Sequence, residues 1–105
     1  MSVVTGVVVT LGVLDERCVQ QIQDWLASNN SHSSLLRQLD QDCGGNKHPQ
    51  FTLLAGGFNY FAEYDFVRFM STLRLEMPEN CVVLLQPEEG ATRVWRADRL
   101  NGWLT

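Results

Sequence analysis

Residues 49–86 read PQFTLLAGGFNYFAEYDFVRFMSTLRLEMPENCVVLLQ, and this stretch decides the fold. Its first part, residues 50–55, is short, apolar and rich in strand-forming residues, and the Gly56 and Gly57 pair behind it predicts a turn. A helix follows, because four apolar residues recur at the spacing of one helical face: Phe66, Phe69, Met70 and Leu73. The continuous apolar run of residues 81–85 predicts a second strand, covered on both faces. We therefore expect a strand, helix, strand unit with a parallel pair of strands.

The N-terminal residues 3–13 are almost entirely valine, threonine, leucine and glycine. This composition predicts the central strand of the sheet, also buried on both faces. Asp15 follows it at a position suited to the N-cap of a first helix. The apolar face of that helix is expected to contain Cys18, Val19, Ile22, Trp25 and Leu26.

Residues 34–42 fit two structures. Leu35, Leu36 and Leu39 have the spacing of a short helix, but they also fit a strand that pairs back onto residues 50–55. The loop between these segments contains two adjacent glycines, which is a hairpin signal. We favour the strand and keep the helix as the alternative.

The chain ends with a turn, a strand and a tail. Pro87 begins a turn that leads into an antiparallel strand over residues 91–97, with Val94 on one face and Arg93 on the other. The tail over residues 98–105 contains large apolar side chains, so we expect it to dock on the body of the protein.

The order of these elements predicts an α+β fold. Strand, helix, strand, strand, helix, strand is the ferredoxin-like (βαββαβ) order of a two-layer sandwich, and the last segment adds a C-terminal antiparallel strand. We expect one domain over residues 1–105, with both helices on one face of a mixed sheet.

Composition excludes several classes of protein. The net charge of −4 disfavours general nucleic-acid binding, which needs cations to neutralise phosphates. No apolar run approaches the about 18 residues that a membrane helix requires, so we expect no membrane partner. The cysteines, Cys18, Cys43 and Cys81, are odd in number and have no paired spacing. This argues against a disulfide framework and favours the cytoplasm.

Catalytic and metal chemistry have little support in the sequence. His48 lies near Asp40, Asp42 and Cys43, but no His-x-x-His or Cys-x-x-Cys pair accompanies it. A polar turn is therefore the favoured interpretation of this segment. We expect no catalytic residue, no metal site and no cofactor.

Two classes of function remain open. The first, which we favour, is a non-catalytic interaction protein, such as an acidic inhibitor or immunity-type partner that binds a basic protein. Its candidate interface residues are Glu88, Glu89, Arg93, Trp95 and Trp103. The alternative is a small-molecule-binding protein or cofactor-free enzyme, with a pocket between sheet and helices or at a dimer interface. Its candidate ligand-binding residues are His48, Tyr60, Tyr64 and Trp95.

The sheet itself predicts a partner. Helices on one face leave the other face of residues 3–13 and 81–85 apolar and in need of cover. A second copy of the chain or the C-terminal tail could supply it, and we expect a homodimer because closed twofold pairs are the commonest assemblies.

Overall fold

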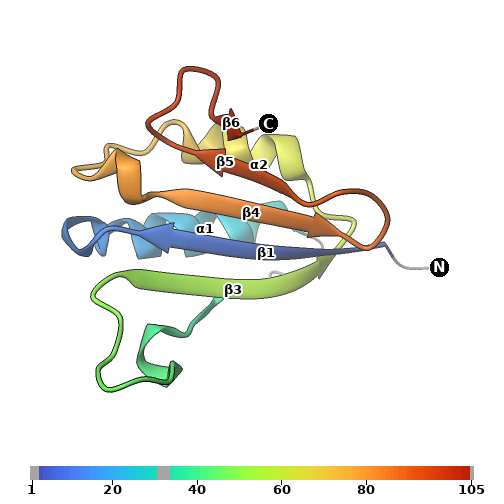
Figure 1. The fold of residues 1–105 in the computed structure, drawn as a ribbon. Coiled ribbons are helices and arrows are strands. Elements are labelled where there is room, and N and C mark those ends of the chain that lie inside the picture. The colour runs from blue at the N-terminus through green and yellow to red at the C-terminus, as the bar shows by residue number, and fades with distance from the viewer. Residues whose placement is uncertain (1–2, 31–33, 105) are drawn as a thin grey trace.

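A computed structural model describes residues 3–30 and 34–104 of the chain. Within these residues, two α-helices lie on one face of a six-stranded antiparallel sheet (Figure 1). The strands are β1 (Val4–Leu11), β2 (Arg37–Gln38), β3 (Thr52–Asn59), β4 (Val82–Pro87), β5 (Arg93–Arg96) and β6 (Trp103–Leu104). The helices are α1 (Cys18–Asn29) and α2 (Glu63–Met70), and 3-10 turns are formed by η1 (Val13–Asp15), η2 (Asp40–Asp42) and η3 (Pro78–Asn80). Neither described helix has the length and apolar character needed to cross a membrane.

The strand order is β2-β3-β1-β4-β5-β6, and every neighbouring pair is antiparallel. Strands β3 and β4 run in the same direction but do not pair, because β1 lies between them. Val8 of β1 is opposite Ala55 of β3 on one side and Leu84 of β4 on the other. The expected α+β class is confirmed, whereas the expected parallel pair and mixed sheet are wrong. The connection through α2 joins β3 to β4, and β1 lies between these two strands in the sheet.

Strand β3 continues through Gly56 and Gly57, where the sequence predicted a turn. Both glycines stay paired with β1, and the left-handed backbone occurs later, at Tyr60 with φ of 51°. Close packing explains one of the glycines, because a Cβ on Gly56 would lie 3.2 Å from Cδ2 of Leu36. The glycine permits a close approach between segments rather than a turn.

Residues 34–42 contain both a short strand and a helical turn. Strand β2 pairs Arg37 with Ala55 and Gln38 with Leu54, which confirms the predicted hairpin onto β3. The strand is only two residues long because the 3-10 turn η2 follows at once. The tail also docks as expected, since β6 pairs with β5 at the edge of the sheet.

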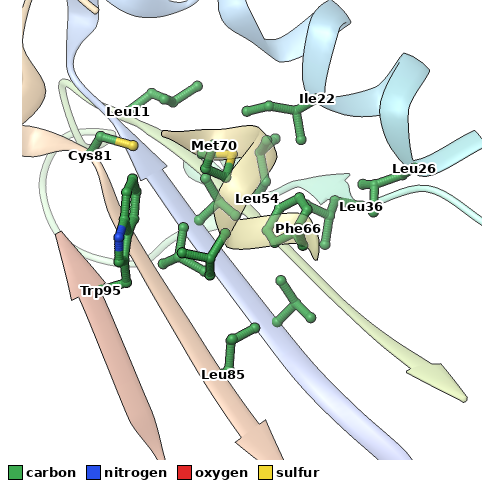
Figure 2. Packing of buried hydrophobic residues seen from close by; sticks show 14 of the residues in the cluster. Leu11, Ile22, Leu26, Leu36, Leu54, Phe66, Met70, Cys81, Leu85 and Trp95 are labelled. Atoms are coloured by element: carbon green, nitrogen blue, oxygen red, sulfur yellow. The ribbon is translucent and has the colours of Figure 1, made fainter. Parts of the chain in front are cut away.

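The core lies between the sheet and the two helices (Figure 2). Strand β1 alternates, with Val7, Val9 and Leu11 buried beneath the helices and the intervening residues more exposed. Strand β4 alternates in the same way. The prediction that both strands are buried on both faces is therefore wrong within one chain. The helices contribute the fully buried side chains of Ile22, Leu26, Phe66 and Met70.

Asp15 does not cap the first helix as predicted. The helix begins at Cys18 without a side-chain cap, while Asp15 is fully buried in η1. Its carboxylate accepts hydrogen bonds from the backbone N–H groups of Glu76 at 2.6 Å and Met77 at 2.8 Å. The carboxylate thereby ties the turn after β1 to the segment that connects α2 with β4.

Candidate interaction surface

The sheet face opposite the helices carries two rows of apolar side chains. Residues that pair directly across neighbouring strands point to the same face, so the register shows which side chains lie together. One row runs without a break from β3 to β6 and contains Ala55, Val8, Leu84, Val94 and Leu104. Leu53 and Val82 stand in the next row, on either side of Thr10. These seven apolar residues, Val8, Leu53, Ala55, Val82, Leu84, Val94 and Leu104, are called the open-face patch below.

No described segment covers the open-face patch. All seven residues are half-buried, and none of them packs against the core between sheet and helices. In Figure 1 both helices lie behind the sheet, and the face turned to the viewer has no helix in front of it. The C-terminal tail does not cover the patch, contrary to one expectation, because Trp103 and Leu104 extend the edge of the sheet instead.

The size of this face sets what it could bind. Strands about 4.8 Å apart and residues about 3.4 Å apart give the sheet face dimensions of roughly 25 Å by 20 Å. Two such faces in contact would bury on the order of 1,000 Å², which is the lower end for a specific protein interface. The patch contains no charged residue. Arg37 and Arg96 share the face at its margins, where Arg37 pairs with Asp42 and Arg96 with Asp98.

Arg93 lies on the helix side of the sheet, in a cluster of its own. Its guanidinium lies 4.8 Å from the ring centre of Tyr64 and 4.7 Å from that of Trp103. It also donates to Oε1 of Glu63 at 2.6 Å and to the hydroxyl of Tyr64 at 3.0 Å. The hydrogen bond to Glu63 raises the pKa of Arg93, although burial opposes the increase. This cluster joins α2, β5 and β6, and an interface role for Arg93 and Trp103 stays a prediction.

The four residues predicted to bind a ligand do not share one cavity. His48 is exposed and lines a cavity of about 300 Å³ beside Asp40, whereas Trp95 is buried and lines a different cavity near the end of α2. Tyr60 at the end of β3 and Tyr64 on α2 are both exposed. Tyr64 contacts the predicted interface residues Arg93 and Trp103, and Trp95 pairs with Trp103 across β5 and β6.

Asp40 beside His48 is held by local hydrogen bonds. Burial opposes ionisation of its carboxyl group, but hydrogen bonds from the Leu53 N–H and the Gln38 side chain, with His48 nearby, keep the pKa of Asp40 below its ordinary value. These bonds fix η2 against β3. No group of three or more His, Cys, Asp or Glu residues in the described part of the chain could hold a metal ion.

The cysteines are free thiols, of which Cys18 and Cys81 are buried and Cys43 is half-buried. Burial raises the pKa of Cys81 to about 12, and it also raises the pKa of Cys18. Because the thiolate is the reactive form, these two buried cysteines are inert at neutral pH. The thiol of Cys43 donates to the Leu39 carbonyl at 3.3 Å.

The acidic turn of Glu88 and Glu89 is exposed between β4 and β5. Gly90 supplies the left-handed backbone of this turn, with φ of 116°. The Glu88 N–H donates to the Val4 carbonyl at 2.7 Å and fixes the turn against β1. The two carboxylates form no ion pair with the described residues, so they add negative charge at one end of the sheet.

Sequence reasoning did not identify the open-face patch by residue. Val8 and Leu84 belong to continuous apolar runs, in which no alternation separates the core side from the open side. Only the strand register could have made this division. Comparison of this chain with protein-family models, with curated proteins and with solved structures finds no match.

Proposed function

We propose that this protein is a non-catalytic interaction protein that acts as a homodimer, with the open-face patches of two copies packed together. The observation that carries this proposal is an apolar sheet face that no described segment of its own chain covers. A sheet with one apolar face gains stability when that face is packed against another layer. A second identical sheet supplies such a layer.

Charge favours a second copy over the basic protein partner expected from the sequence. A twofold interface places the same surface on both sides, so it suits an uncharged patch and penalises a charged one. On a chain of net charge −4, the open-face patch is a surface where two copies meet without opposing carboxylates. The acidic turn of Glu88 and Glu89 lies at one end of the sheet and would stay at the rim of the dimer.

We also propose the ferredoxin-like description for the whole chain as one domain. The strand order β2-β3-β1-β4, with α1 after β1 and α2 after β3, supports it, and β5 and β6 then extend the sheet beyond β4. In this description the homodimer is a pair of two-layer sandwiches that become a four-layer assembly.

A charge placed within the patch tests the homodimer. Leu84→Lys puts an ammonium group in the middle of the row, where each copy would bury it against an apolar surface. We expect at least a 100-fold weaker dimer, because an unpaired buried charge costs about 3–5 kcal/mol. Sedimentation velocity over a concentration series measures the change. The substitution also makes the chain less acidic, so a loss of dimer could not come from long-range repulsion.

The matched control is Gln21→Lys, which adds the same charge on the exposed side of α1, in the other layer of the molecule. This variant should dimerise as the unaltered protein does. Equal weakening by both substitutions, or a dimer unaffected by Leu84→Lys, would show that the patch is not the interface.

A further inference from the structure

A second candidate site lies on the helix side of the sheet, away from the open-face patch. A half-open cavity of about 520 Å³ is bordered by the end of α2, residues 71–78, Trp95 of β5 and the loop over residues 97–102. Met70 and Trp95 are among the buried apolar side chains that line it, and Figure 2 shows Trp95 at the β5 end of the buried cluster. Small-molecule sites typically measure about 300–1,000 Å³, and the volume of this cavity lies within that range.

Trp95 borders this cavity, whose accessible lining combines polar and apolar groups. The residue is only 4% exposed, and its indole N–H donates no hydrogen bond to any described residue. Every fully enclosed side-chain nitrogen or oxygen in the described residues has a hydrogen-bond partner. The indole nitrogen of Trp95 has none, so it is not fully enclosed and borders open space. The nitrogen faces Gly102, where an added Cβ would overlap it, and Gly102 also lines the cavity. An indole N–H at the margin of a cavity can donate to a bound acceptor, and the cavity beside Gly102 is the place for one.

The charged residues that line the cavity are both cationic, although the protein as a whole is acidic. Arg68 is 79% exposed and has a loose ion pair with Asp65 at 3.9 Å. Such a surface pair is worth little, so it would yield to a better-placed anion. Arg99 is exposed and forms no ion pair with the described residues. Guanidinium groups bind carboxylate-type oxygens through paired hydrogen bonds.

The loop that carries Arg99 is fixed in place before any ligand binds. Gly102 adopts a left-handed backbone with φ of 83°, and its carbonyl accepts a hydrogen bond from the Arg96 N–H at 2.6 Å. The N–H of Ala97 donates to the Cys81 carbonyl at 3.0 Å at the other end of the loop. A preformed site loses less free energy to ordering when it binds.

We infer that this cavity binds a small amphipathic anion with an apolar body and one carboxylate-type head. The body lies on Leu73, Leu75 and Ala97, the half-buried apolar side chains of the lining. The head lies at the loop over residues 97–102, where it accepts the Trp95 N–H and contacts Arg99, with Arg68 facing it from α2. This site is separate from the open-face patch, so it does not depend on the homodimer.

Nuclear magnetic resonance of the indole N–H groups tests this inference directly. The chain has three tryptophans, and Trp95→Phe identifies the Trp95 signal. Octanoate is the probe, octanamide keeps its apolar body without the charge, and acetate keeps the head without the body. We expect octanoate to shift the Trp95 signal with a Kd on the order of 1 mM or lower, and octanamide and acetate to bind at least about tenfold more weakly.

Substitutions then test the two cations. Arg99→Gln and Arg68→Gln should each weaken octanoate binding about five- to tenfold, in line with the loss of one charge-assisted contact. Arg74→Gln removes the same charge from an exposed residue outside the cavity lining and should leave binding unchanged. An unmoved Trp95 signal at about 20 mM octanoate, equal binding of octanoate and octanamide, or equal weakening by Arg74→Gln would each overturn the inference.

Discussion

Substitution of Asp15 should destabilise the fold strongly, because one buried carboxylate serves two distant backbone groups. Asp15 has no exposed surface and accepts hydrogen bonds from the N–H groups of Glu76 and Met77. A hydrogen bond to a charged group contributes about 1.5–3 kcal/mol, and a buried donor left without a partner adds to the loss. Asp15→Asn keeps one acceptor oxygen and turns an amide group toward the other N–H. We expect it to lower the free energy of unfolding by about 2–3 kcal/mol.

Asp15→Ala should cost more, about 4–5 kcal/mol, because it removes both acceptors and leaves a small void. For a chain of about 100 residues, 1 kcal/mol corresponds to roughly 4–6 °C in Tm. The alanine variant should therefore melt about 20 °C lower and the asparagine variant about 10–15 °C lower. Urea titration followed by circular dichroism measures both changes.

Amide hydrogen exchange locates the effect. The N–H groups of Glu76 and Met77 should lose protection in Asp15→Asn before the central strands do, since they lose their acceptor. Glu16→Gln is the control, because it neutralises the adjacent, exposed carboxylate and should change stability by less than about 0.5 kcal/mol. The reasoning is refuted if Asp15→Asn is as stable as Glu16→Gln, or if stability falls with no loss of protection at those two amides.

Three further outcomes are expected. Gly102→Ala should cost about 3 kcal/mol or more in urea unfolding, because φ is 83° and the added Cβ overlaps an indole ring, whereas Gly44→Ala meets open space and should be nearly neutral. A thiol reagent at pH 8 should modify Cys43 quickly and the buried Cys18 and Cys81 only at the rate of unfolding; rapid reaction of all three would contradict their burial. Burial raises the pKa of Cys81 from its ordinary value of 9.0 to about 12 in the folded state. The stability that the neutral thiol contributes is therefore complete below pH 9 and is lost as the pH rises from 9 to about 12. Over that range the free energy of unfolding should fall by up to about 1.4 kcal/mol per pH unit, and Cys81→Ala should remove this slope. A slope that is the same in Cys81→Ala would contradict the raised pKa of Cys81.

Local sequence patterns predicted the elements of this fold better than their pairing. The spacing of Phe66 and Met70 gave α2 its buried face, and the glycine loop before Gln50 predicted the β2–β3 hairpin. Gly56 was misread as a turn because its cause, the approach of Leu36, is a tertiary contact. Asp15 was misread as a cap for the same reason, since its hydrogen-bond donors lie about 60 residues away in the chain.

The candidate sites depend even more on tertiary structure. The sequence analysis named Trp95 as a candidate site residue. It could not place Arg68 of α2 and the loop residue Arg99 at the same cavity, because only the folded chain brings the three together. Likewise, the apolar run over residues 81–85 indicated a strand but could not separate Leu84 on the open face from Leu85 in the core. Residues 3–13 and 81–85 are apolar on both faces, which led to the prediction that they are fully buried. Their second apolar face is instead the one that we propose for self-association.

Methyl NMR spectra recorded over a dilution series test the homodimer most directly. Val8, Leu84 and Leu104 belong to the open-face patch, whereas Val9 and Leu85 lie one position away on the same strands as the first two and are buried in the core. We expect the methyl signals of the first three to move with concentration between about 10 μM and 1 mM, the range expected of a weak dimer with a small interface, and those of the other two to stay fixed. Open-face methyl signals that do not move over this range, or movement confined to residues outside the patch, would contradict the proposed dimer.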